Sequence, residues 1–156
     1  MNGTEKLQAA LAECRLHAEV LTEALDELGQ PHFTAESATH LTSAQRRLLD
    51  QLAYRFAKLQ DSMGEKVLNQ AIELAEEPIA EDVTFAQKLQ RLERLGAIES
   101  AAEWRELREL RNQIAHEYAD QPGLRAAAIN RFVIGVGRLI ALWKQAEAFV
   151  SRHATP

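Results

Sequence analysis

The feature that most constrains the fold is the recurrence of apolar residues at steps of three and four along nearly all of the 156-residue chain. This spacing places apolar side chains on one side of an α-helix. No stretch alternates apolar and polar residues over the length of a strand. Composition agrees, because 26 alanines and 21 leucines favour helices, whereas only 20 residues are valine, isoleucine or threonine. The sequence therefore predicts an all-α protein.

Residues that start and stop helices divide the sequence into five predicted segments. Thr4 can cap the first segment, and the sequence Gly29-Gln30-Pro31 ends it. Thr42 or Ser43 begins the second segment, after a polar connector at residues 32–40. The predicted segments span about residues 5–28, 43–77, 83–95, 101–121 and 124–150. Segments of this length, joined by short loops, predict an antiparallel four-helix bundle with an additional shorter helix, formed as one domain over residues 1–156.

Two glycine positions indicate close packing of helices. Gly64 interrupts the second segment and indicates a bend or a close helix contact. The sequence Gly135-Val136-Gly137 lacks the third glycine and the Lys-Ser/Thr pair of a phosphate-binding loop, and it lies within a helical pattern. We therefore expect these glycines to let helices approach each other and not to bind phosphate.

The residue inventory argues against disulfide and metal chemistry. The chain has one cysteine, Cys14, which cannot close an intrachain disulfide or build a cysteine zinc site. Its place on an apolar helix face predicts a small core residue and not a nucleophile. The pairs Glu13–His17 and Glu36–His40 are each one residue too far apart for the Glu-x-x-His motif of helical di-iron sites. We expect neither a metal nor a cofactor.

Membrane insertion and secretion are not expected either. The longest apolar stretch, Phe132–Trp143, contains Arg138 and is much shorter than the roughly 20 residues that cross a bilayer. Glu5, Lys6 and Glu13 interrupt the apolar core that a signal peptide would need. The sequence therefore predicts a cytoplasmic protein.

Charge is distributed unevenly along the chain, whose formal net charge is −5. Residues 1–40 carry a balance of −5, whereas residues 85–144 carry +3. Arg105, Arg108 and Arg111 form a run in the basic part, among glutamates. Such a run is typical of a solvated helix face, but it also allows contact with a phosphate backbone.

One short sequence near the end of the fourth segment combines groups that phosphodiester cleavage uses. This segment begins with a capping box, Ser100 with Glu103 three residues later, and ends with RNQIAHEY. Its Arg111 can stabilise negative charge on phosphate, and its His116 can transfer a proton to or from a ribose hydroxyl without a metal. The helix dipole near a C-terminus favours a protonated imidazole. A surface helix with an incidental histidine is the alternative interpretation.

Helix geometry separates the arginine from the histidine. On a regular helix Arg111 and His116 point about 140° apart, whereas Asn112 and His116, four residues apart, share one face. One chain therefore forms a poor catalytic pair by itself. A cleft shared between two copies across a two-fold axis would bring both groups to one phosphate.

RNQIAHEY resembles the Arg-x4-His-x-Tyr signature of HEPN-domain proteins, specifically the HepT-like ribonuclease toxins. Asn112 is the polar residue usual after the arginine, and Tyr118 is the motif tyrosine. Residues 54–61 (YRFAKLQD) and the stretch LERLGAIES…WRELREL are also similar to that family. The resemblance is strong over residues 54–118 and extends to the chain's length and helix order.

The resemblance implies a homodimeric HEPN-like helical bundle that acts as a metal-independent endoribonuclease toxin on RNA. Arg111 would stabilise the scissile phosphate, His116 would act as acid and base, and Asn112 would orient one of them or the RNA. A minimal nucleotidyltransferase antitoxin would neutralise the toxin by transferring AMP to Tyr118. AMP at this position would fill the RNA site and place a phosphate where Arg111 holds substrate.

Other interpretations remain open. Asp61 and Lys58 either face the same cleft or form an exposed pair within their own helix. Trp104 is expected in the core or at the dimer interface and not as a base-stacking platform. Instead of an enzyme, the chain could be a non-catalytic module that binds a nucleotide or scaffolds a nucleotidyltransferase, as its acidic net charge favours. The remaining alternative is a structural dimerisation domain.

Overall fold

The structure is a computed structural model that describes residues 2–29, 31–75, 80–114, 118 and 120–154. These residues form helices and connecting turns, and none of them lies in a strand, which confirms the all-α prediction. In chain order the elements are α1 (Gly3–Leu28), α2 (Ala35–Thr39), α3 (Ser43–Ser62), η1 (Met63–Val67), α4 (Leu68–Leu74), α5 (Phe85–Leu95), α6 (Ala101–Ile114) and α7 (Pro122–Ala154).

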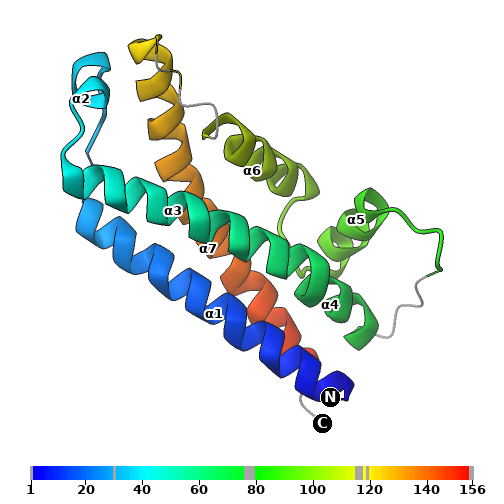
Figure 1. Cartoon of the computed structure of the whole chain (residues 1–156). Coiled ribbons are helices and arrows are strands. Elements are labelled where there is room, and N and C mark those ends of the chain that lie inside the picture. Colours follow the sequence, from blue (N-terminus) through cyan, green and yellow to red (C-terminus); the bar gives the residue numbers. More distant parts are fainter. Residues whose placement is uncertain (1, 30, 76–79, 115–117, 119, 155–156) are drawn as a thin grey trace.

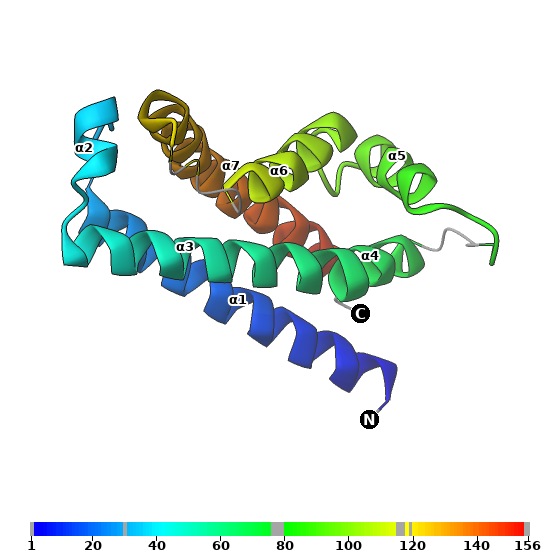
Figure 2. The ribbon, with the colours of Figure 1, turned by 45° about the horizontal axis from the view of Figure 1, so that its top comes forward.

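The long helices lie against one another in alternating directions. α1 and α3 run side by side in opposite directions, and α7 packs against α1, α4 and α6 (Figure 1). α6 runs back along α3, with α5 beside it and against α4 (Figure 2). One apolar core joins α1, α3, α4, α5, α6 and α7. α6, which carries the start of the RNQIAHEY sequence, is therefore held between α3 and α7.

Side-chain caps determine where several helices begin. Of the two starts that the sequence offered, Thr42 and Ser43, it is Thr42 that caps α3, in a capping box with Gln45. α1 starts earlier than expected, because Asn2, and not Thr4, accepts from the backbone N–H of Glu5 and caps it. The connector 32–40, expected to be irregular, contains the short helix α2, which a second threonine capping box begins.

A π-helical turn, η1, joins α3 to α4 and contains Gly64. Such turns hold one extra residue and often lie at functional sites. A Cβ atom at Gly64 would stand 3.3 Å from Cζ2 of Trp104 and 3.6 Å from Cζ of Phe85. Gly64 thus makes the close helix contact that the sequence indicated. Trp104 is buried, as expected, but Phe85 is 40% exposed.

α6 is shorter than the apolar pattern suggested. The pattern predicted a helix over about residues 101–121, but α6 ends at Ile114. Tyr118 has φ +49°, a left-handed conformation that cannot continue a right-handed helix. The carbonyl of Tyr118 accepts from the backbone N–H of Gln121 at 3.0 Å in a turn. Pro122 begins α7, two residues before the predicted start at about residue 124, because proline fits the first helical position.

α7 is the one helix in the described part of the chain that is long and apolar enough to cross a membrane by length and composition. However, 56% of its most apolar 18-residue window is buried inside the protein. Gly135 explains part of this packing, since a Cβ there would stand 2.5 Å from Cδ1 of Leu110 on α6. Gly137 has no such neighbour. The expected helix contact is therefore confirmed for Gly135 only.

A partly buried polar cluster joins α1 to α3 and η1. Nδ1 of His17, a residue that is 7% exposed, lies 3.0 Å from Nη1 of Arg55. Glu13 accepts from Ser62 at 2.8 Å and from Lys66 at 3.0 Å. Burial and the nearby Arg55 charge lower the pKa of His17 below its usual 6.5. The hydrogen bonds from Lys66 and Ser62 lower the pKa of Glu13 below its usual 4.5.

These lowered pKa values predict acid sensitivity. As the pH falls below 6.5, the unfolded chain protonates at His17 before the folded protein does, so stability is lost from there downward through the folded pKa. Glu13 adds a second loss of stability as the pH falls below 4.5, because the unfolded chain protonates at Glu13 before the folded protein does. Thermal melts between pH 8 and pH 3 measure both losses, and His17→Gln is expected to remove the first phase only. An unchanged pH profile in that variant would contradict the assignment.

Candidate functional site

Arg111 lies on the last turn of α6, on the same side as the residues that α6 buries. Trp104, Leu107, Arg111 and Ile114 follow one another at steps of three, four and three, which places them on one face. Trp104 and Leu107 are buried against the core. Arg111 therefore points toward α3 and not away from the protein, and its side chain is 31% exposed.

Asp61 of α3 binds Arg111 across the two helices. Nη1 of Arg111 donates to Oδ1 of Asp61 at 2.8 Å, and Nη1 of Arg108 approaches the same oxygen at 3.4 Å. The side chains of Asp61 and Arg108 are 37% and 52% exposed, so the pairs contribute little to stability. Their effect is geometric, because one carboxylate holds two guanidinium groups together. Two positive charges and one negative charge leave this cluster positive.

Lys58 takes a different place from Asp61. Its ammonium lies 5.6 Å from the ring centroid of Tyr54, which Arg55 also approaches at 5.6 Å. The sequence left open whether Asp61 and Lys58 face one cleft or pair within their helix. In the structure Asp61 pairs across the helices with Arg111, whereas Lys58 lies over the exposed ring of Tyr54. Asp50, Tyr54, Lys58 and Asp61 share one side of α3 at steps of four, four and three.

The remaining motif residues lie beside or beyond the end of α6. Asn112 is exposed on α6, next to Arg111. His116, the predicted acid and base, lies outside the described residues, so its distance to Arg111 is not defined. The predicted angle of about 140° between the two side chains therefore stays a prediction.

Tyr118 lines a cavity of about 310 Å³ at the far end of α6. This cavity lies between α3, α6 and the first turns of α7, and its wall includes Arg46, Gln113 and Arg125. One of its cations comes from α3 and the other from α7. Asp50 also lines it and partly balances these charges. The cavity can therefore hold a small anionic group beside the phenol.

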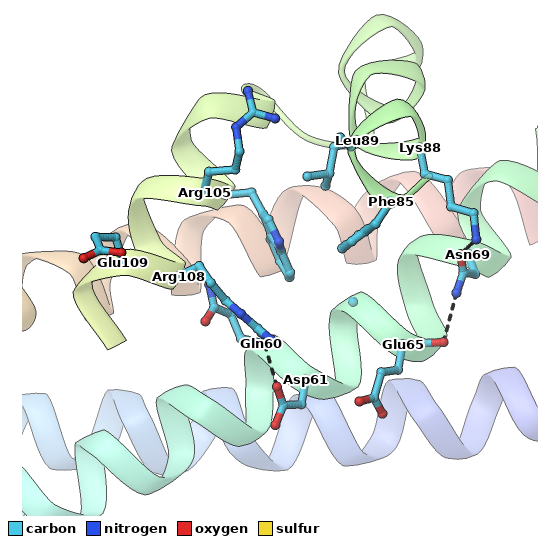
Figure 3. Close-up of a pocket in the computed structure, with 13 residues that line it drawn as sticks. Gln60, Asp61, Glu65, Asn69, Phe85, Lys88, Leu89, Arg105, Arg108 and Glu109 are labelled. Atoms are coloured by element: carbon cyan, nitrogen blue, oxygen red, sulfur yellow. Dashed lines mark hydrogen bonds and ion pairs between the residues drawn. The ribbon is translucent and has the colours of Figure 1, made fainter. Parts of the chain in front are cut away.

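A second and larger cavity lies at the opposite end of α6, between η1, α5 and the first turns of α6 (Figure 3). Its wall includes Asp61 and Arg108 of the arginine cluster. In Figure 3, Arg108 points down toward Asp61, whereas Arg105 points away from it. The cluster of Asp61, Arg108 and Arg111 thus lies between two cavities, both bordered by α3 and α6.

Cys14, which the sequence assigned to the core, lies fully buried. Burial raises the pKa of the Cys14 thiol to about 12, so it is protonated and unreactive near neutral pH. Within the described residues no group of three or more histidine, cysteine or carboxylate side chains could hold a metal ion.

Sequence reasoning missed two residues of this region. Arg108 shares the Asp61 carboxylate, although the sequence pattern indicated that the run of Arg105, Arg108 and Arg111 lies on a solvated helix face. Gln60 is fully buried and lines the larger cavity, and its amide oxygen and nitrogen have no hydrogen-bond partner among the residues that the structure describes. The only sequence signal for Gln60 was its place beside Asp61 in the stretch YRFAKLQD.

Comparison of the chain with family models, with curated proteins and with solved structures found no match. What the site does must therefore be argued from its own chemistry.

Proposed function

We propose that the protein is a HEPN-like, HepT-like endoribonuclease toxin that cleaves RNA without a metal. The single observation that carries this proposal is the position of Arg111. Its guanidinium is partly exposed at the end of α6 and is oriented by Asp61, one turn from Arg108. A planar, always charged fork held in this way can bind a phosphate through two hydrogen bonds and stabilise the charge that develops on it.

His116 supplies the proton chemistry in this proposal. As base it removes the proton of the ribose 2′-hydroxyl, whose oxygen attacks the adjacent phosphorus and displaces the 5′-oxygen. As acid it returns a proton to that leaving oxygen. The products carry a 2′,3′-cyclic phosphate, or a 3′-phosphate after hydrolysis. Asn112, exposed beside Arg111, orients the imidazole or the RNA.

The proposal includes a cytoplasmic homodimer built from antiparallel four-helix bundles, each with an additional shorter helix. The regular packing of α1, α3, α6 and α7 supports this description of the fold. A two-fold axis beside the end of α6 would bring the Arg111 and His116 groups of two copies to one cleft. The exposed ring of Tyr54, on the same side of α3 as Asp61, offers apolar area for such a contact.

Regulation by a nucleotidyltransferase antitoxin is also proposed. The phenol oxygen of Tyr118 attacks the α-phosphorus of ATP, and pyrophosphate leaves. Arg46 and Arg125 line the same cavity as Tyr118, which supports binding of the attached phosphate there. Because Tyr118 lies two residues after His116, the nucleotide would obstruct access to the RNA site.

A non-catalytic module that binds a nucleotide or scaffolds a nucleotidyltransferase is the second candidate. It is favoured by the hydrogen bond from Arg111 to Asp61, because this bond uses one of the guanidinium donors that a substrate phosphate would need. The net charge of −5 also favours it. Expression without a partner distinguishes the two. The toxin arrests growth, whereas the binding module does not.

Cleavage in the presence of EDTA tests the ribonuclease directly. The purified, unmodified protein is expected to cut single-stranded RNA and to leave 2′,3′-cyclic or 3′-phosphate ends. An all-deoxy oligonucleotide of the same sequence is the matched control, because it lacks the attacking hydroxyl. Comparable cleavage of both substrates would contradict the mechanism, and intact RNA after prolonged incubation would contradict the function.

A further inference from the structure

A groove of about 730 Å³ lies between the end of α1 and the middle of α7. Leu25, Val133 and Ile134 give it apolar walls, and Asp26 adds one charge. Ile134 is 67% exposed, the largest exposed fraction of any large apolar side chain that the structure describes. Gly137 also lines the groove, and a Cβ atom there would meet nothing within 4 Å. The groove is therefore open to solvent beside a projecting aliphatic side chain.

The groove belongs to a longer uncharged strip on the outer side of α7. Phe132 packs on Phe56 of α3 with ring centroids 5.2 Å apart, so the opposite side of α7 faces away from the bundle. The middle of this outer side carries, over a rise of about 30 Å, Ala127, Asn130, Ile134, Gly137, Ala141 and Ala148. The neighbouring α1 exposes Glu19, Glu23 and Glu27 instead. Because a helix that faces water normally carries charged residues there, another surface is expected to cover this strip.

The order of large and small residues along this strip is complementary to itself. When two copies of α7 pack in opposite directions about a two-fold axis just after Gly137, Ile134 of each copy lies opposite Ala141 of the other. Ala127 lies opposite Ala148 in the same way. Gly137, beside the axis, has no side chain to hold the helices apart. The one large side chain of the strip thus meets a small one, as close packing requires.

The charges that border the strip fit the same arrangement. Lys144 follows the groove residues Val133 and Gly137 by eleven and seven positions, so it lies on the edge of α7 that faces α1. Lys144 and Asp26 are both exposed, and neither has an ion-pair partner among the described residues. The same two-fold axis carries Lys144 of the partner subunit to the level of Arg131, over the groove. Its methylene groups can cover the apolar walls while its ammonium reaches Asp26.

We propose that this face of α7 binds a second copy of the chain in the antiparallel direction, across a two-fold axis. The contact lies on the side of α7 away from α3, whereas Arg111 binds Asp61 of α3 at the proposed catalytic cleft. The two interfaces therefore use different surfaces, and one chain can form both at once. Together they would build an assembly larger than a dimer. The α7 contact itself does not rest on the proposed ribonuclease function.

Sedimentation equilibrium of the full-length protein over a wide range of concentrations measures this contact. One helix on each side makes a small interface, so we expect reversible association that is lost on dilution. The wild type should reach a tetramer or larger species if the catalytic dimer also forms, and a dimer if it does not. A monomer at every concentration would overturn the proposal and leave this face to a different occupant.

Gly137→Gln places a side chain at the centre of the contact. Because a Cβ atom at Gly137 has open space around it, the variant should fold with the helix content of the wild type, as circular dichroism measures. The mass of its largest species should be at most half that of the wild type. Gly123→Gln, at an exposed glycine in the first turn of α7 with equally open surroundings, is the matched control and should assemble like the wild type. Equal masses for the two variants would refute the α7 contact.

Charge reversal tests the antiparallel direction. Asp26→Lys places a lysine against Lys144 of the partner subunit and should weaken association several-fold. Asp26→Lys combined with Lys144→Asp pairs opposite charges again and should recover the association of the wild type. No recovery in the double variant would contradict this arrangement. RNA cleavage is a separate measurement, since assembly through α7 without any cleavage by the wild type would refute the ribonuclease alone.

Discussion

Replacement of Arg111 by alanine is expected to slow RNA cleavage by about two to three orders of magnitude, the usual effect of removing one donor to a developing oxyanion. The substitution removes the guanidinium that Asp61 orients and leaves Trp104 and Leu107, the buried residues of the same face of α6, in place. Folding should therefore be preserved, since exposed ion pairs contribute about 0–1 kcal/mol. Initial rates on a labelled RNA in EDTA, together with thermal melts, measure both effects.

The matched control for this prediction is Arg131→Ala on α7. Arg131 is an exposed arginine outside the cluster, so the variant changes the net charge equally. A general loss of RNA affinity would slow both variants alike and raise KM. A loss of transition-state stabilisation lowers kcat in the Arg111 variant alone. Cleavage by Arg111→Ala at the wild-type rate would remove this residue from the mechanism.

Asp61→Asn separates the orientation of Arg111 from its charge. The amide keeps the shape of the carboxylate and can accept a hydrogen bond, but it no longer balances the charges of Arg108 and Arg111. We expect kcat to fall less than in the Arg111 variant, because the guanidinium is still present. RNA affinity should rise or stay unchanged, since the cluster gains positive charge.

Local sequence signals located the end of α1, the start of α3, the end of α5 and the start of α6, because caps and glycines act within a few residues. Thr42 and Gly29 show this. The Thr42 side chain accepts a hydrogen bond from the backbone N–H of Gln45, and Gly29 ends α1 with a positive φ that glycine adopts readily. The end of α6 was misplaced for a different reason. Ile114 and Tyr118 keep helical spacing, but the chain must reverse before Pro122 to start α7, and this requirement comes from the packing of α7 and not from spacing.

The site was only partly predictable, because its contacts join distant segments. Arg111 and Asp61 are 50 residues apart in sequence, and only the packing of α6 on α3 chooses Arg111 over Lys58 as the partner of Asp61. Gln60 could not be recognised from periodicity. α3 is covered by α1 on one side and by α6 on another, so its buried arc includes both Leu59 and Gln60.

Loss of the Tyr118 hydroxyl is expected to abolish modification completely, because the proposed linkage forms at that oxygen. The protein produced together with a neighbouring nucleotidyltransferase should show a mass increase of one or more adenylate units. Tyr118→Phe should show none, and cells that produce it should stop growing even with the partner present. Intact mass spectrometry, followed by peptide mapping, measures the modification.

The chain provides a stringent control for this prediction, since Tyr54 is the second of its two tyrosines. Tyr54 is 57% exposed, whereas Tyr118 is half-buried, so modification governed by access alone would occur at Tyr54. Only Tyr118 lines a cavity with Arg46 and Arg125, which can bind the phosphate of an incoming nucleotide. Tyr54→Phe should therefore be modified like the wild type. Adenylate mapped to Tyr54, or retained by Tyr118→Phe, would show that the cavity does not direct the transfer.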